Sequence, residues 1–205
     1  MSYNQHQLLS SRLSPVRPSK ISREELLKRC ANTFKRLGYN GTTMDELSAA
    51  CGLTKASFYH HYPSKEALLR DVLAWTHEGL KQSLFSLAYD ESLSPKERLE
   101  AMGRKAKKLF LSEDSIGCLM GVVAIDATYT RADLMAPIRE FFNDWMHALT
   151  KLYEGTHGKA VAQVFAQQLV ADYEGAILLA RIYNDSRFID GVTQRASAQL
   201  EAFST

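Results

Sequence analysis

The sequence of 205 residues contains little cysteine, and its few cysteines follow no disulfide or metal-binding pattern. The three cysteines, Cys30, Cys51 and Cys118, lie far apart in the chain and form no CxxC pair. Disulfide-stabilised small domains and structural zinc sites both need closely spaced cysteines. The sequence therefore predicts reduced thiols, no disulfide framework and no metal site.

Long apolar runs are also missing from the chain. No stretch approaches the roughly 18 to 20 consecutive apolar residues that a membrane-spanning helix requires. The N-terminal segment MSYNQHQLLSSRLSPVRPSK lacks the apolar centre of a secretion signal. We therefore expect a cytoplasmic protein without a membrane partner.

The motifs of common enzyme classes are absent as well. The sequence has no glycine-rich phosphate loop, no GxSxG nucleophile motif, no HExxH metal motif and no clear pair of catalytic carboxylates. The adjacent acids Asp45 and Glu46 are explained by a favourable position at the start of a helix. We therefore expect no enzyme activity, no catalytic residue and no cofactor.

The chain does contain an ordinary share of apolar residues and an uneven distribution of charge. Its hydrophobic content of 45% and charged content of 23% are typical of a globular protein long enough for two small domains. Up to Ser83 there are 12 Lys and Arg against 7 Asp and Glu, whereas the remainder has 13 against 16. A basic front part suits an approach to phosphates, although surface charges also scatter in this way.

The most informative segment is TMDELSAACGLTKASFYHHYPSK, at residues 43–65, which has the pattern of two short helices separated by a glycine turn. Thr43 and Glu46 form a capping box at the start of the first helix. Gly52 supplies a left-handed residue that ends this helix. The pattern is typical of a DNA-reading helix-turn-helix.

The second short helix has an apolar underside and a polar outer face. Thr54 is its N-cap, and Phe58 is the side chain expected to be buried. The remaining positions up to His61 are mostly polar and available to face outward. Pro63 and Ser64 then end this helix and cap a long one.

The segment TKASFYHHYPSK, residues 54–65, resembles the helix-turn-helix of the TetR family of bacterial transcriptional regulators. In that family the element after the glycine turn typically reads Ser/Thr, Lys, small, Ser/Thr, apolar, Tyr, aromatic or His residues, Pro, Ser, Lys. The resemblance extends back to Ser22 and on to about Leu80. It implies an all-α fold, in which an N-terminal three-helix DNA-binding domain is joined by a long helix to a C-terminal helical domain for ligand binding and dimerisation.

The resemblance also implies which residues contact DNA. A recognition helix in the major groove reads base edges, while neighbouring side chains hold phosphates. The residues implied to read bases are Thr54, Lys55, Ala56 and Ser57. Those implied to contact phosphates are Thr43, Tyr59, His60, His61 and Lys65. A structural role is the alternative for each, such as a helix cap for Thr43 and Thr54 or a packed surface ring for Tyr59.

We divide the chain into three parts. Residues 1–19 are polar, contain two prolines and lack helical periodicity, so we expect a flexible basic arm that either contacts the DNA backbone or stays in solvent. Residues 20–80 are assigned to the DNA-binding domain, with the helix-turn-helix motif at 43–62. Residues 81–205 are assigned to a regulatory and dimerisation domain.

Helical periodicity continues on both sides of the motif. Ser22 and Glu25 form another capping box, and the helix that follows ends at Gly38. In the rear part the apolar residues recur at three- and four-residue steps, and a loop is expected from Gly155 to Gly158. No strand-like alternation interrupts this pattern, so the chain is predicted to be all helix.

Two long rear helices are apolar over an arc wider than a single bundle of this size covers. This surplus indicates a second copy of the chain, although broad apolar faces also occur on fully internal helices. In the family resembled, the last two long helices form a four-helix bundle with their mates. The resemblance therefore implies a homodimer through the helices within residues 159–184 and 186–203, and a palindromic operator in double-stranded DNA.

The rear domain is implied by the resemblance to bind a small-molecule inducer that lowers the affinity for DNA. Aromatic and sulfur-containing side chains are the candidates for the walls of such a pocket. They are Met102, Phe110, Cys118, Met120, Tyr129, Phe142 and Trp145. Residues of these types also fill ordinary helical cores, which is the alternative for each.

Cys118 has a further possible role. The segment SIGCLMG around it resembles a GCL segment in a subgroup of these regulators, some of which sense electrophiles or oxidants through that thiol. A buried structural cysteine is the other interpretation. The sequence thus predicts a homodimeric, ligand-responsive repressor. The alternatives are a thiol-based sensor acting through Cys118 and a constitutive DNA-binding protein without a ligand.

Overall fold

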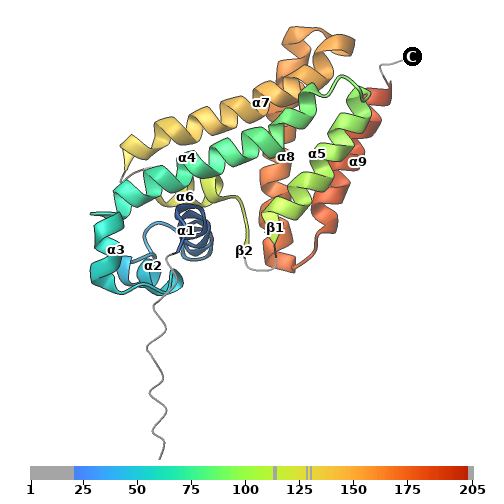
Figure 1. The fold of residues 1–205 in the computed structure, drawn as a ribbon. Coiled ribbons are helices and arrows are strands. Elements are labelled where there is room, and N and C mark those ends of the chain that lie inside the picture. The colour runs from blue at the N-terminus through green and yellow to red at the C-terminus, as the bar shows by residue number, and fades with distance from the viewer. Residues whose placement is uncertain (1–20, 113–114, 128, 130, 203–205) are drawn as a thin grey trace, which may run out of the picture.

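The computed structural model describes residues 21–112, 115–127, 129 and 131–202. The arm predicted at residues 1–19 lies outside this part of the chain. Within it the protein is all-α, as the sequence predicts: three N-terminal helices are joined through a long helix to a larger C-terminal helical group (Figure 1).

The α-helices follow one another along most of the described chain. Their bounds are α1 Arg23–Leu37, α2 Met44–Ala50, α3 Lys55–His61, α4 Lys65–Ser83, α5 Pro95–Phe110, α6 Leu119–Ala127, α7 Met135–His157, α8 Lys159–Tyr183 and α9 Arg187–Ala202. Two 3-10 helices, η1 (Phe85–Tyr89) and η2 (Ala132–Leu134), complete the helical content of the described residues.

A short antiparallel strand pair interrupts the helices between α5 and α6. Strand β1 (Leu111–Ser112) pairs with β2 (Ser115–Ile116), and Leu111 lies opposite Ile116. The prediction that nothing but helix occurs was wrong in this detail. Pairs of two residues give no alternating pattern long enough to detect in a sequence.

The predicted helix caps are mostly present. The Thr43 hydroxyl accepts a hydrogen bond from the Glu46 backbone N–H at 3.2 Å, and the Glu46 carboxylate accepts one from the Thr43 N–H at 2.7 Å. Ser22 accepts from the Glu25 N–H at 3.1 Å, but the Glu25 carboxylate instead accepts from Arg29 Nε at 2.6 Å. The predicted capping box at α1 is therefore only half formed.

Glycine ends the first two helices as predicted. Gly38 and Gly52 have φ angles of +73° and +67°, a region that other residues rarely adopt. The loop predicted from Gly155 was wrong, because α7 continues through this residue to His157. Only Gly158 separates α7 from α8, and its φ of +71° turns the chain back.

The helices α1, α2 and α3 enclose a small apolar core against α4. Phe58 of α3 and Leu47 of α2 are fully buried in it. The thiols of Cys30 on α1 and Cys51 at the end of α2 are also buried, with their sulfur atoms 3.6 Å apart. The buried Phe58 and the packing of α3 on α2 therefore hold α3 in place.

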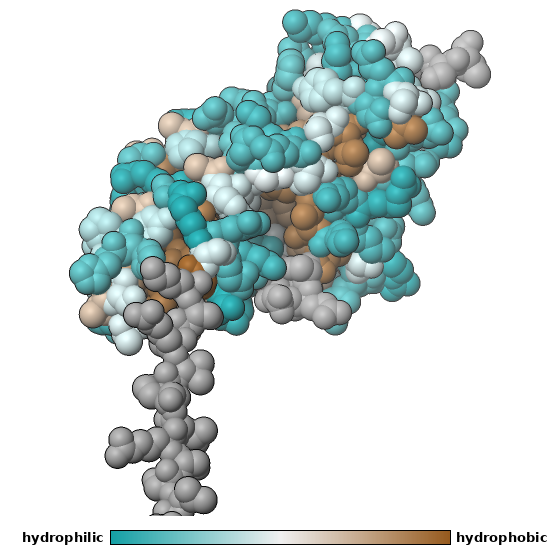
Figure 2. All heavy atoms as spheres, viewed as in Figure 1, coloured by the Kyte–Doolittle hydropathy of each residue, from teal (hydrophilic) through white to brown (hydrophobic). Residues whose placement is uncertain are grey.

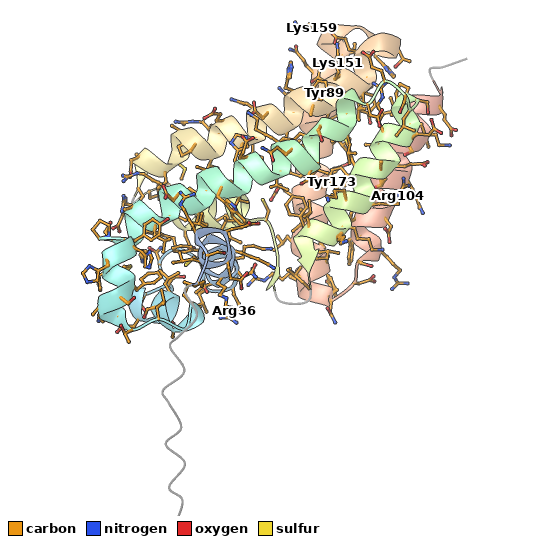
Figure 3. All side chains as sticks on the ribbon, viewed as in Figure 1. Arg36, Tyr89, Arg104, Lys151, Lys159 and Tyr173 are labelled. Carbon is orange, nitrogen blue, oxygen red and sulfur yellow. The ribbon has the colours of Figure 1, made fainter. Side chains whose placement is uncertain are left out.

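An aromatic cluster fills the C-terminal group. The Trp145 ring of α7 stacks on Phe110 of α5 and on Tyr173 of α8, with ring centroids 5.8 and 5.9 Å apart. Phe85 stacks on the same indole at 6.2 Å. Figure 3 shows Tyr173 on α8 beside α5, while Lys151 and Lys159 mark the end of the α7–α8 hairpin farthest from α1–α3.

A membrane crossing requires a helix that is both long and strongly apolar. None of the helices in the described part of the chain has the length and the apolar composition needed to span a bilayer.

Candidate functional site

The outer face of α3 is polar and open to solvent. Phe58 is 0% exposed and anchors the helix to the core. The predicted contact residues on the other faces are exposed, apart from a half-buried Ser57: Thr54, Lys55, Ala56, Tyr59, His60 and His61. The structure thus brings seven of the sequence-predicted residues together on one short helix and its cap.

Local hydrogen bonds and charges shape this face. The Thr54 hydroxyl accepts a hydrogen bond from the Ser57 N–H at 3.2 Å, so this side chain is a helix cap in the absence of DNA. The Lys55 ammonium pairs with Asp45 of α2 at 2.7 Å, and both side chains are more than half exposed. Such an exposed pair is weak, and the lysine can exchange a carboxylate for a phosphate at little cost.

Lys65 is placed differently from the other predicted phosphate contacts. Its ammonium donates hydrogen bonds to the backbone carbonyls of Tyr39 and Thr42, both at 2.8 Å. It also lies over the Tyr39 ring, 4.2 Å from the centroid. Burial lowers the pKa of Lys65. This side chain therefore ties α4 to the loop after α1, and one of its three N–H groups remains for a phosphate.

A second network joins the front helices to the C-terminal group. The Arg131 guanidinium donates to the Tyr39 hydroxyl at 2.9 Å and pairs with Glu66 of α4 at 3.0 Å. Arg131 also binds Asp133 at 2.9 Å, and Asp133 in turn binds Arg70 of α4 at 2.6 Å. We call these five residues the Arg131 network.

Sequence reasoning missed the Arg131 network. Arg131 and Tyr39 are 92 residues apart, and no local spacing connects them. The hydrogen bond from Tyr39 to the Glu66 carboxylate at 2.7 Å lowers the pKa of Glu66 to about 2. The strongly perturbed acid therefore lies where the two helical groups meet, and not on the outer face of α3.

A cavity of about 410 Å³ lies between α1, α4, the end of α5 and the start of α6. Three of the predicted pocket residues line it: Phe110, Cys118 and Met120. Met102, Phe142 and Trp145 do not, because their side chains pack in the hydrophobic core, with Phe142 stacked on Trp145 at 6.5 Å. Tyr129 cannot line the cavity in this conformation, since its side chain is 97% exposed.

Cys118 is buried at the start of α6. Burial raises the pKa of its thiol well above the ordinary value, and the nearby Glu174 carboxylate raises it further. The thiolate is the reactive form of cysteine, so this environment disfavours a reactive sensor. Glu174 reaches Cys118 from α8, and burial raises the pKa of this carboxyl group as well.

The helix α8 exposes an unusual number of large apolar side chains. Val161, Val164, Leu178, Leu179, Ile182 and Tyr183 are between 38% and 66% exposed. A groove beside the end of α8 is lined by residues of α8 and α9, among them Gly175 and Gly191 and the charged Asp172 and Arg195. Val161 and Val164 lie near the start of the helix and the other four near its end, so apolar surface is open at both ends of α8.

The chain is similar to known transcriptional regulators in both of its helical groups. Residues 23–72 match the family model "Bacterial regulatory proteins, tetR family". Residues 95–195 match "Transcriptional regulator LmrA/YxaF-like, C-terminal domain". The two matches together account for most of the described residues.

Among curated proteins, the chain is 26% identical over 174 residues to the HTH-type transcriptional repressor DhaR of Mycobacterium sp. (strain GP1), covering 82% of this chain and 86% of that protein. It is also 26% identical to the uncharacterized regulator YxaF of Bacillus subtilis, over 80% and 87% of the two chains. A TetR transcriptional regulator from Legionella pneumophila has the same fold, with a TM-score of 0.80, 24% identity, and 88% and 98% of the two chains covered.

Proposed function

The chain belongs to the TetR family of transcriptional regulators, which are non-enzymatic DNA-binding proteins, and from this premise we propose that it is a homodimeric repressor released from an inverted-repeat operator by a small-molecule inducer. The observation that carries the proposal is the arrangement of α3. Its polar face is exposed, while Phe58 is fully buried and holds it in a fixed orientation. A helix held in this way can enter the major groove as a unit.

We assign the reading of bases to Thr54, Lys55, Ala56 and Ser57, and the backbone contacts to Tyr59, His60, His61 and Thr43. The exposure of the α3 residues and the weak Lys55–Asp45 pair support this assignment. Lys65 contributes mainly by holding α4 against the loop after α1, and its remaining N–H is available to a phosphate.

We further propose that residues 20–80 form the DNA-binding domain and residues 81–205 the regulatory domain, with the boundary inside α4, which continues to Ser83. The arm at 1–19 would add backbone contacts. Because Arg131 binds Tyr39 in the loop after α1 and Asp133 of η2 binds Arg70 of α4, a displacement of η2 would reach the DNA-binding helices through these bonds.

The palindromic operator follows from a proposed homodimer through α8 and α9. The exposed apolar side chains of α8 lie on one long helix, and the groove between α8 and α9 lies beside four of them and offers surface to a second copy. Two-fold symmetry then presents one α3 helix to each half-site.

The cavity between α1, α4, α5 and α6 is the proposed inducer site. Its volume of about 410 Å³ falls within the roughly 300 to 1,000 Å³ of small-molecule pockets. This favours a ligand-responsive regulator over a constitutive DNA-binding protein. The raised pKa and burial of Cys118 make the thiol-sensor alternative weaker than the ligand-binding one.

The proposal is tested by selecting DNA fragments with the purified full-length chain and footprinting the enriched sequences. We expect an inverted repeat with two protected half-sites roughly one helical turn apart, bound by a dimer. Enrichment of no sequence, or protection of a single half-site by a monomer, would overturn the proposed function.

A further inference from the structure

The cavity beside α1 carries an unusual charge for a pocket with apolar walls. Lys35 of α1 lines it and is only 9% exposed. In the part of the chain that the structure describes, no carboxylate forms an ion pair with this ammonium. Holding an ammonium group in apolar surroundings is costly, and here burial lowers the pKa of Lys35.

Further positive groups surround the same space. Lys28 of α1 and Lys108 of α5 also line the cavity, and both are exposed at its rim. Arg181 of α8 donates a hydrogen bond to the Lys35 backbone carbonyl at 3.3 Å, which places a guanidinium group close to Lys35. The nearby acid is Glu174, whose side chain hydrogen-bonds Cys118 and whose pKa is raised by burial.

The remaining walls suit the body of an organic molecule. Trp75 of α4 and Phe110 of α5 provide aromatic surface, and Figure 2 shows a hollow with apolar residues along its α5 side. The hydroxyl oxygen of Thr76 is buried in the wall and has no hydrogen-bond partner among the described residues. A buried polar atom of this kind is normally satisfied by a ligand or a water molecule.

We propose that this cavity binds a small aromatic or aliphatic carboxylate, whose acid group pairs with the Lys35 ammonium and whose apolar body lies against Trp75 and Phe110. The inference rests on the proposed function and names the chemical class of its inducer. A carboxylate removes the cost of the unpaired ammonium through a charge-assisted hydrogen bond. Neutral compounds of the same shape leave that cost in place.

The location of the cavity explains how such an anion would affect DNA binding. One wall is α1, which packs on α2 and through it on α3, and the opposite wall is formed by α5 and the first turn of α6. A ligand in this space contacts both helical groups. It therefore favours one spacing between them, which is the differential affinity that a switch requires.

The test compares arylalkanoic acids with their uncharged amides, from phenylacetate to naphthylbutyrate, by isothermal titration calorimetry on the full-length protein. We expect at least one acid to bind roughly tenfold or more tightly than its amide, the effect of one charge-assisted hydrogen bond. Lys35→Met keeps the apolar stem and removes a buried charge, so it should fold and lose this preference. Lys159→Met, at the far end of the α7–α8 hairpin (Figure 3), should retain it.

The outcomes separate this inference from the proposed function. Equal binding of acids and amides across the series, no binding by any acid, or an acid preference that survives Lys35→Met would overturn the anion site. A preference that depends on Lys35, together with unchanged binding to the selected operator at saturating acid, would support the anion site and contradict inducer-linked release.

Discussion

The Arg131 guanidinium donates a hydrogen bond to the Tyr39 hydroxyl across 2.9 Å, and so connects the chain after α6 to the loop after α1. The same guanidinium pairs with Glu66 and Asp133, which links α4 and η2 to this bond. The N-terminal helices α1–α4 and the C-terminal group are therefore joined by hydrogen bonds and ion pairs as well as by apolar contact.

Arg131→Ala should destabilise the protein by about 1 to 2 kcal/mol, because it removes several charge-assisted hydrogen bonds from a side chain that is only 23% exposed. It should also weaken the release of DNA by an inducer, since one connection between the helical groups is lost. Urea unfolding measures the first effect. Arg139→Ala, an exposed position on α7, is the control and should change stability by less than about 0.5 kcal/mol.

The pH dependence of stability should report on Glu66. The hydrogen bond from Tyr39 lowers the pKa of Glu66 to about 2 from an ordinary value of 4.5. A lowered pKa gives stability that is present above pH 4.5 and is lost as the pH falls towards 2.

Thermal melts at closely spaced pH values should therefore show a smaller acid-induced loss in Glu66→Gln than in the native chain. Tyr39→Phe keeps the ring beneath Lys65 but removes the hydroxyl. Its acid-induced loss of stability should therefore lie between those of Glu66→Gln and the native chain. An identical pH dependence in all three proteins would contradict the assignment.

Replacing Gly38 with alanine should lower the stability of the protein, whereas replacing Gly155 with alanine should raise it. Gly38 has a φ of +73°, and a Cβ there would collide with the Asp126 carboxylate. Gly38→Ala should cost about 1 to 3 kcal/mol. Gly155 lies inside α7, and a Cβ added there would meet nothing within 4 Å, so Gly155→Ala should stabilise by roughly 0.5 to 1 kcal/mol. A neutral or stabilising Gly38→Ala would contradict the cost assigned to its positive φ, and a destabilising Gly155→Ala would contradict the open space at that position.

The α8 surface predicts the oligomeric state. Leu178 and Ile182 are 56% and 62% exposed, so replacing both with Lys should leave the fold intact and produce a monomer. Sedimentation equilibrium measures the change, with Gln167→Lys on the same helix as the control. Operator affinity should fall together with the dimer, because only a dimer engages both half-sites. A double variant that remains dimeric would place the interface elsewhere.

Local chemistry explains what the sequence could predict. The Thr43–Glu46 box, the Thr54 cap and the φ angles of Gly38 and Gly52 depend on residues within a few positions of each other. The pattern of the α3 helix, with Phe58 inward and its neighbours outward, follows from helical spacing alone.

Contacts between distant segments explain what the sequence could not predict. Nothing local places Arg131 beside Tyr39, or the Cys30 and Cys51 sulfur atoms 3.6 Å apart. Choosing aromatic and sulfur-containing residues predicted only some of the residues that line the cavity. Trp145 belongs to an aromatic core, whereas the polar Lys35 lines the cavity. Which side of a helix faces a cavity depends on how the helices pack, and this is not encoded in composition.

The exposed face of α3 provides the most direct test of DNA recognition. Phe58→Ala should unfold or destabilise the protein by about 3 to 5 kcal/mol, so it cannot separate binding from folding. Tyr59 is 43% exposed, and Lys55 is 61% exposed at its side chain, so both tolerate alanine without loss of the fold.

The decisive measurement is therefore fluorescence anisotropy of the Lys55→Ala, Tyr59→Ala double variant on the selected operator, at fixed salt and with an unchanged melting temperature as the control. We predict a loss of affinity of roughly 100-fold, because a base contact and a backbone contact are removed together. Affinity equal to that of the native protein would contradict the claim that α3 reads DNA.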